Sequence, residues 1–224
     1  MSNLYIVATP IGNMQDITSR ALLTLNSVGA VLCEDTRQTK KLFERYEIKT
    51  THLIPLNEFN EENVLYEALS LLKTVNVALV SDAGTPLISD PGYRLVSEAR
   101  KRGITVIPIP GPSAVITALS ASGLPTDKFY FLGFLPKTRS KAVRNLESVK
   151  DLETTVVLYE SPHRIRETLE LIKEIYGDIE VTVARELTKV HEEIHSGAAT
   201  KLIGEYEKKQ PKGEFVLLFS TRTL

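Results

Sequence analysis

Ser81-Asp82-Ala83-Gly84-Thr85-Pro86-Leu87-Ile88-Ser89-Asp90-Pro91-Gly92 lies between an apolar run at residues 76–80 and a helical pattern at residues 93–102. A short apolar run, a glycine- and proline-rich loop and a helix, in that order, are typical of a parallel α/β sheet. Glycine lets backbone amides approach a ligand closely, and proline reduces the conformational freedom that a loop loses on binding. The segment therefore predicts an α/β fold and a small-molecule site at the end of a strand.

The same alternation extends outward from this loop along the whole chain. In the first half, it predicts strands at residues 4–8, 30–33, 52–56, 76–80 and 105–109, and helices at 18–26, 36–45, 61–72 and 93–102. In the second half, it predicts strands at 129–132, 155–159, 180–184 and 215–220, and helices at 113–120, 140–149 and 164–175. We therefore expect two α/β domains with mostly parallel sheets. The proline-rich stretch at residues 108–113 predicts the joint, giving an N-terminal domain of residues 1–112 and a C-terminal domain of residues 113–224.

Two more unusual loops follow predicted strands of the first domain, namely Thr9-Pro10-Ile11-Gly12-Asn13 and Pro110-Gly111-Pro112-Ser113-Ala114. Each loop alone is most simply a tight turn. The carboxyl ends of parallel strands share one edge, so three such loops together favour a concave ligand site. Asp82 places a carboxylate there for a ribose hydroxyl or an amine. The free amides of a helix that begins at Ser113 and Ala114 are suited to a carboxylate or a phosphate.

Composition narrows the classes of function. The net charge is −1, from 27 basic and 28 acidic residues, which argues mildly against a protein that coats nucleic acid. Two basic groups nevertheless exist, each most simply a solvated helix face; they are Arg37, Lys40, Lys41 and Arg45, and Lys137, Arg139, Lys141 and Arg144. The single cysteine, Cys33, excludes an intramolecular disulfide, and its apolar surroundings predict an inert core thiol. No signal peptide or apolar run of about 20 residues is present, so we expect a cytoplasmic protein.

Several familiar motifs are missing or mismatched. The sequence contains no Gly-x-Gly-x-x-Gly, no P-loop and no Gly-x-Ser-x-Gly. His191-Glu192-Glu193-Ile194-His195 matches the His-Glu-x-x-His pattern of zinc proteases, which requires a helix. The segment follows a β-branched run and precedes Gly197, which favours a strand and a loop instead. We therefore expect no metal site and keep a zinc hydrolase as a minor alternative.

Six segments, in order along nearly the whole chain, resemble the tetrapyrrole methylase superfamily (class III methyltransferases), and more closely the ribosomal RNA small subunit methyltransferase I family. They are Thr9 to Asn13 with Asp16, Glu34 to Arg37, Ser81 to Gly92, Pro108 to Ala114, Tyr159-Glu160-Ser161-Pro162-His163-Arg164, and Arg185-Glu186-Leu187-Thr188-Lys189 with His191 and Glu192. The resemblance implies 2′-O-methylation of a cytidine in the decoding region of 16S rRNA. It also implies a homodimer and S-adenosylmethionine held in a cleft between the two domains.

The resemblance further implies cofactor contacts from both domains. They would be Pro10, Asp82, Gly84, Thr85, Pro86, Leu87, Ser113 and Ala114, joined by Tyr159, Glu160, Ala184 and Gly213. Many family members continue past the last strand, whereas this sequence ends at Leu224. We therefore expect the two core domains, or a partner, to grip the RNA within the small ribosomal subunit.

A ribose hydroxyl is a poor nucleophile until a positioned group accepts its proton. The candidate acceptors are Glu34, Asp35, Glu186 and Lys189, with Arg37 and Arg185 placed to hold phosphate. Each of them can instead form a structural ion pair or cap a helix, as Asp35 is placed to do. The group of Lys137, Arg139, Lys141 and Arg144 would then contact RNA phosphates. A methyltransferase of the same fold that acts on a small tetrapyrrole, and a non-catalytic sensor of S-adenosylmethionine, remain alternatives.

Overall fold

The structure, a computed structural model, describes residues 2–57, 59–208 and 211–222. By its internal contacts the chain divides into two units, Met1–Ser113 and Ala114–Leu224. This division lies one residue beyond the boundary predicted from the proline-rich stretch.

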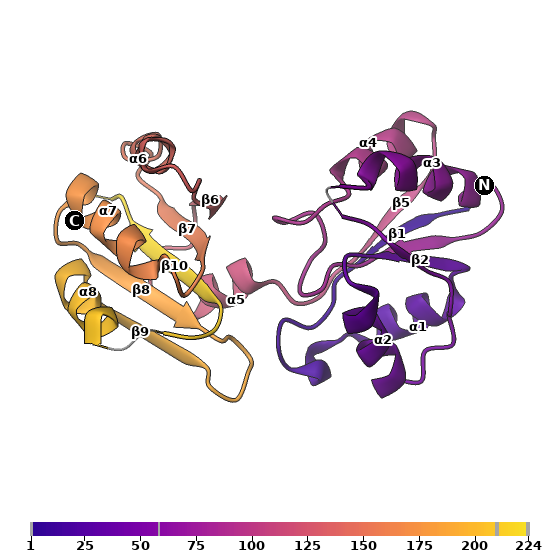
Figure 1. The fold of residues 1–224 in the computed structure, drawn as a ribbon, viewed down its shortest axis with the longest axis horizontal. Coiled ribbons are helices and arrows are strands. Elements are labelled where there is room, and N and C mark those ends of the chain that lie inside the picture. Colours follow the sequence, from indigo (N-terminus) through magenta and orange to yellow (C-terminus); the bar gives the residue numbers. More distant parts are fainter. Residues whose placement is uncertain (1, 58, 209–210, 223–224) are drawn as a thin grey trace. The chain divides into compact units, whose positions relative to one another are not determined.

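The first unit is built on a five-stranded sheet whose neighbouring strands are all parallel. The strand order is β3 (Leu53–Pro55), β2 (Ala30–Cys33), β4 (Val77–Leu79), β1 (Leu4–Val7) and β5 (Val106–Ile109). Helices α1 (Ser19–Ser27) and α2 (Thr36–Arg45) cover one face, and α3 (Glu61–Leu71) and α4 (Tyr93–Lys101) cover the other (Figure 1). Because both faces are covered, the strands are apolar throughout, and β2 is completely buried.

Two apolar clusters, one on each face, hold this unit together. Alternate strand residues point to opposite faces, so Leu32 packs toward α3 and α4 whereas Val31 and Cys33 pack toward α1 and α2. The Cys33 thiol is buried and its pKa is raised by that burial, as expected of a core cysteine. The parallel α/β class predicted for the first half of the chain is confirmed.

The second unit contains a mixed sheet of order β6 (Phe129–Phe134), β7 (Thr155–Glu160), β10 (Phe215–Ser220), β8 (Glu180–Arg185) and β9 (Glu193–Ala198). Only β6 and β7 are parallel, and the other three neighbouring pairs are antiparallel. The prediction of mostly parallel strands is wrong for this sheet. A parallel connection needs a crossover of a dozen or more residues, and the short turn between β8 and β9 leaves no room for one.

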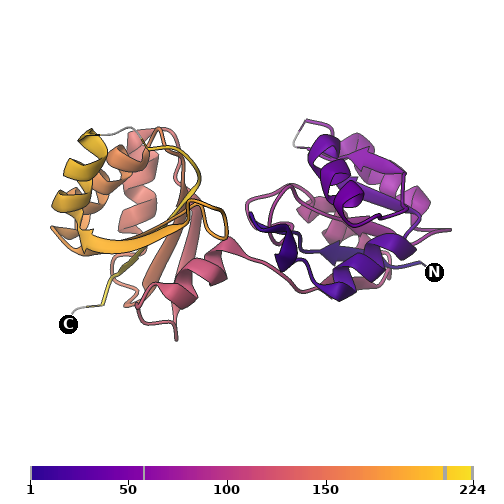
Figure 2. The same cartoon turned by 90° about the horizontal axis from the view of Figure 1, so that it is seen from below.

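Helices cover both faces of the second sheet (Figure 2). One face carries α6 (Arg139–Glu147), α7 (Ile165–Tyr176) and α8 (Ala199–Lys208), whose apolar residues share one core with Val156, Leu158 and Leu217. Helix α5 (Ala114–Ala121) packs against β7 and β10. The segment after α5 lies on the same side, since the Thr182 hydroxyl donates to the Ser122 carbonyl at 3.5 Å.

Two elements were not predicted: α8 and the short 3₁₀ helix η1 (Met14–Asp16); β9 was expected only as part of a strand-and-loop segment, without bounds. Strand β9 lies at an edge of its sheet and is polar, so it lacks the apolar alternation that indicates a strand. Within the described part of the chain, no helix combines the length and the apolar character needed to cross a membrane.

Candidate cofactor and substrate site

Hydrogen bonds join the three glycine- and proline-rich loops of the first unit. Thr9, two residues after β1, exchanges two backbone hydrogen bonds with Gly84, in the loop after β4, at 2.9 and 3.0 Å. The Thr85 hydroxyl donates to the carbonyl of Pro112, in the loop after β5, at 3.0 Å. The loops that carry Pro10, Asp82 and Ser113 therefore meet at one sheet edge.

Glycine is required at two points of this junction. Gly84 has a φ of +82°, and a β-carbon there would lie 3.3 Å from Ile11 and 3.8 Å from the Pro112 carbonyl. At Gly111, a β-carbon would come within 2.9 Å of the Ala8 side chain. The loop also holds Leu87 and Ser89 at positive φ angles of 77° and 70°. Non-glycine residues seldom adopt this conformation, and such residues often mark functional loops.

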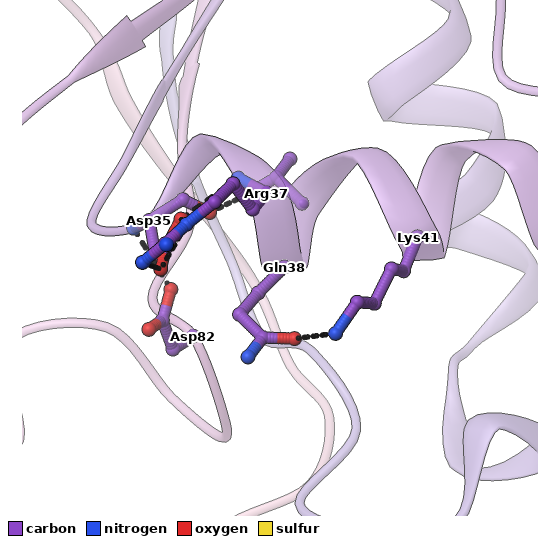
Figure 3. Close-up of polar contacts among 6 residues, drawn as sticks. Asp35, Arg37, Gln38, Lys41 and Asp82 are labelled. Atoms are coloured by element: carbon purple, nitrogen blue, oxygen red, sulfur yellow. Dashed lines mark hydrogen bonds and ion pairs between the residues drawn. The ribbon is translucent and has the colours of Figure 1, made fainter.

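Asp82 connects this junction to helix α2. Its Oδ1 accepts the backbone N–H of Asp35 at 2.9 Å, so the loop after β4 holds the residue that begins α2 (Figure 3). The Asp82 side chain remains accessible to solvent, although partial burial raises its pKa. The carboxylate is thus anchored through one oxygen at the rim of the joined loops.

Asp35 caps α2 and binds Arg37. Its carboxylate accepts the backbone N–H of Arg37 at 2.8 Å and three hydrogen bonds from the Arg37 guanidinium, the shortest at 2.6 Å (Figure 3). The hydrogen bonds from the Arg37 side chain and backbone lower the pKa of Asp35 to about 2. A general base works best with a pKa near the working pH, so these contacts favour the capping role over proton transfer. Glu34, the preceding residue, is exposed.

Asp90 lies in the loop after β4, as Asp82 does, and the sequence predicted no role for Asp90. Burial, with the negative charges of Glu34 and Asp82, raises its pKa to about 6, although a hydrogen bond with Ser81 acts to lower it. Three carboxylates, on Glu34, Asp82 and Asp90, therefore influence one another at this edge of the sheet. The only sequence feature that pointed to Asp90 was the presence of a second aspartate in this loop.

The pKa of Asp90 predicts how stability depends on pH. Because the folded state raises that pKa from 3.8 to about 6, Asp90 favours folding below pH 4 and loses this contribution as the pH rises through 6. An Asp90→Asn variant should therefore be more stable than the unchanged protein at pH 7, by about 1 kcal/mol after allowance for solvent screening. Chemical denaturation between pH 4 and 7 measures the difference, which should vanish at the acidic end.

Asp127 provides a control for which the pH dependence of stability has the opposite sign. Its pKa is lowered by the Arg222 guanidinium, so it stabilises the fold above its ordinary pKa and loses that effect in acid. Asp127→Asn should be less stable than the unchanged protein at pH 7, and this deficit should shrink on acidification. A pH-independent difference for Asp90→Asn would contradict the raised pKa.

In the second unit, Glu186, Lys189 and Glu214 form a compact ion network. Lys189 Nζ lies 2.8 Å from Glu186 Oε1 and 2.8 Å from Glu214 Oε2. Burial disfavours the Lys189 ammonium, but hydrogen bonds to Glu186 and Glu214 outweigh it and raise the pKa of Lys189. Lys189 is therefore protonated at neutral pH, which opposes its predicted role as a proton acceptor. The pKa of Glu186 is lowered, because contacts with Lys189 and the Glu214 amide outweigh its burial.

Gly213 lies against this network. Its φ is +103°, and a β-carbon would collide with Glu186 at 2.6 Å. Glu186 itself has a positive φ of 49° and exchanges backbone and side-chain hydrogen bonds with Glu214, both at 3.0 Å. The turn after β8 and the turn before β10 are thus held together, and Gly213 allows these two turns to approach closely.

Of the other predicted cofactor contacts in the second unit, Ala114 begins α5, and Tyr159, Glu160 and Ala184 lie on β7 and β8. Glu160 is only 2% exposed; it accepts the Thr168 hydroxyl at 2.6 Å and the Ser161 amide at 2.7 Å. Both of its oxygens therefore support the start of α7. Tyr159 packs edge-on against Phe131 with ring centroids 4.9 Å apart. Ala184 is fully buried and pairs with Val216 of β10.

The predicted RNA-binding group lies on and just before α6. Arg139 pairs with Glu174, and Arg144 Nε donates to the Ser140 carbonyl at 3.3 Å. Lys137 and Lys141 are exposed. The role of this group in RNA binding stays a prediction.

His191 and His195 do not share a helix. His191 lies in a turn, and His195 lies on strand β9. The zinc-protease pattern needs both on one helical face, so this geometry contradicts the hydrolase alternative and agrees with the expected strand and loop. Among the described residues, no group of three or more His, Cys, Asp or Glu side chains is placed to hold a metal ion.

Comparison with known proteins places this architecture in one class. Residues 3–203 match the family of Tetrapyrrole (Corrin/Porphyrin) Methylases. The chain therefore belongs to the tetrapyrrole methylase family, and the predicted family resemblance is confirmed.

Within this family, the chain is similar to several proteins named ribosomal RNA small subunit methyltransferase I. The protein from Thermotoga maritima is 48% identical over 98% of this chain and 99% of the relative. That from Vibrio cholerae is 51% identical over 96% of this chain and 76% of the relative. That from Bacillus subtilis is 47% identical over 97% of this chain and 75% of the relative.

Two solved structures share the fold. Diphthine synthase superposes with a TM-score of 0.78 at 15% identity, covering 100% of this chain and 91% of the other. Uroporphyrin-III-C-methyltransferase from Thermus thermophilus gives a TM-score of 0.67 at 20% identity, covering 99% and 96%. At these identities the similarity concerns the fold alone.

Proposed function

We propose that this chain transfers a methyl group from S-adenosylmethionine to the ribose 2′-hydroxyl of a cytidine in the decoding region of 16S rRNA. The observation that carries the proposal is 45–51% identity, over nearly the full chain, to relatives named ribosomal RNA small subunit methyltransferase I. Diphthine synthase and the uroporphyrin methyltransferase share the fold at much lower identity, so the RNA substrate is favoured over a small tetrapyrrole.

The joined loops of the first unit fit the cofactor. A β-carbon added at Gly84 would crowd Ile11, and one added at Gly111 would crowd Ala8. Because glycine has no side chain, the backbone at both positions stays near the surface of the junction. Asp82 uses one oxygen for the Asp35 amide and remains accessible, which suits a hydroxyl or ammonium group of the ligand. In this proposal Pro10, Thr85, Pro86, Leu87 and Ser113 complete the contacts from this unit.

S-adenosylmethionine, when bound, supplies a methyl group on a positively charged sulfur, so the protein has to position the acceptor more than activate the donor. Asp35 and Lys189 are engaged as a helix cap and as an ion-paired ammonium. Among the predicted proton acceptors of the first unit, Glu34, an exposed carboxylate directly after β2, is the candidate base. Arg37 neutralises Asp35 and keeps the start of α2 in place beside Glu34.

The proposal also includes a homodimer and a cytoplasmic location, as family membership and an RNA substrate in the ribosome suggest. Both stay predictions.

Transfer of tritium from labelled S-adenosylmethionine tests the function. We expect label in the RNA of small ribosomal subunits that lack the modification, and none in a uroporphyrin-type tetrapyrrole. Label in the tetrapyrrole alone would favour the small-molecule enzyme. Tight cofactor binding without transfer to any substrate would favour the sensor.

A further inference from the structure

Helix α2 presents a dense basic surface in a protein whose net charge is −1. Its ten residues include Arg37, Lys40, Lys41 and Arg45 but only one acid, Glu44. The buried residues Thr39, Leu42 and Phe43 occupy the opposite side of the helix and face the sheet. At 100° per residue, all four basic side chains project from the outward half.

Three of these cations are not neutralised. Lys40, Lys41 and Arg45 form no salt bridge with any described residue, and each is exposed. Lys41 donates to Gln38 Oε1 at 3.1 Å (Figure 3). Arg45 lies 6.0 Å from the ring centre of Tyr46, so neither contact cancels charge. Arg37 differs, because its guanidinium binds Asp35. The surface in question is therefore formed by Lys40, Lys41 and Arg45.

Other charged helices show the more usual arrangement. On α4, Lys101 lies 2.7 Å from Glu98, and Arg102, at the end of that helix, lies 3.9 Å from it. On α7, Arg166 pairs with Glu170 at 2.9 Å. A basic helix face whose charges are left unpaired indicates an anionic partner better than a paired, solvated face does.

Both ends of α2 are tied to the loops of the candidate site. At the first end, the Asp35 amide donates to Asp82 in the loop after β4. At the last end, the Tyr46 hydroxyl donates to the Met14 carbonyl, in the segment after β1, at 2.5 Å. The basic surface is thus held beside two of the three loops proposed to bind the cofactor, and from Lys40 to Arg45 it extends about 7.5 Å along the helix.

We propose that Lys40, Lys41 and Arg45 of α2 form a docking surface for the phosphates of the RNA backbone. This inference rests on the proposed function and adds a second contact to the group expected on α6. Exposed lysine and arginine bind phosphate by displacing condensed counterions, which gives affinity without sequence preference. The surface positions the RNA next to the site, and other contacts choose the nucleotide.

The test is a combined Lys40→Gln, Lys41→Gln and Arg45→Gln variant of the full chain. Glutamine keeps helix propensity and side-chain length, so α2 should persist, which circular dichroism checks. Binding to small ribosomal subunits is measured between about 50 and 200 mM salt. We expect the slope of log affinity against log salt to fall by about 2, and affinity to drop at least roughly tenfold at the low-salt end. The KM for subunits should rise by a similar factor, while cofactor affinity stays unchanged.

Arg100→Gln, Lys101→Gln and Arg102→Gln together provide the control, since they remove the same charge from the end of α4. This variant should keep the affinity, the salt slope and the methyl transfer. Equal losses in both variants would overturn the proposal by showing a general charge effect, and no loss in the α2 variant would also overturn it. Failure of the proposed function is distinct, because the unchanged protein would then transfer no methyl group to the subunit.

Discussion

Replacing Asp82 with alanine is expected to weaken S-adenosylmethionine binding roughly 10- to 100-fold and to remove most methyl transfer at ordinary cofactor concentrations. The range follows from the 1.5–3 kcal/mol contributed by a hydrogen bond to a charged group. Asp82 is expected to serve two purposes. It holds the Asp35 amide at 2.9 Å, and its accessible carboxylate is proposed to contact the cofactor. Isothermal calorimetry with the cofactor measures the loss.

Asp82→Asn separates these two purposes. The asparagine oxygen can still accept the Asp35 amide, so the start of α2 and the stability of the fold should be preserved. The negative charge is lost, so cofactor affinity should still fall about tenfold. If Asp82→Asn binds the cofactor as tightly as the unchanged protein, the carboxylate is not the ligand contact that we propose.

The second large effect is expected at Gly213. A β-carbon there lies 2.6 Å from two atoms of the Glu186 side chain, so Gly213→Ala must displace Glu186 and break its bonds to Lys189 and the Glu214 amide. The φ of +103° adds backbone strain for any side chain. Together these effects should lower the free energy of unfolding by about 2–4 kcal/mol. Denaturant titration of the whole chain measures this change.

Gly177→Ala is the matched control for Gly213→Ala. Gly177 has a similarly positive φ of +83°, but a β-carbon there meets nothing within 4 Å. Gly177→Ala should therefore lower the free energy of unfolding by about 1 kcal/mol, through backbone strain alone. Equal destabilisation by the two substitutions would mean that the Glu186 network adds nothing measurable.

The first unit could be predicted from the sequence because its local signals agree with its fold. Strand β2 is a fully buried apolar run, and α2 begins directly after Asp35, whose side chain caps it; both elements have the predicted bounds. The loops after β1, β4 and β5 carry the glycines and prolines that their joined geometry requires. Parallel topology then brings those loops to one edge without any further information.

The second unit was harder because its signals are not local. Edge strand β9 is polar, and the apolar residues of helix α8, which follows it, were not recognised as a helical pattern. Strand direction in this sheet depends on how β8, β9 and β10 pair, which periodicity does not report. Single-sequence patterns therefore found the strands β6, β7, β8 and β10 but not the antiparallel arrangement.

Candidate site residues could be proposed from the sequence, but the contacts that they make could not. The Asp35–Arg37 pair and the Glu186–Lys189–Glu214 network each changed the interpretation of a predicted proton acceptor. The burial of Glu160 beneath Thr168 and the raised pKa of Asp90 likewise depend on three-dimensional packing. The positive charge of α2 was visible in the sequence, whereas the lack of salt bridges from three of its cations to any described residue was not.

Methylation of small-subunit RNA by this chain can be tested directly by one measurement. Small ribosomal subunits that lack the modification are incubated with the full chain and S-adenosylmethionine, and the decoding-region RNA is digested and analysed by mass spectrometry. We expect a gain of one methyl group on the ribose of a single cytidine, dependent on the cofactor and strongly reduced with Asp82→Ala. An unmodified decoding region, or a methyl group on a base, would contradict the account.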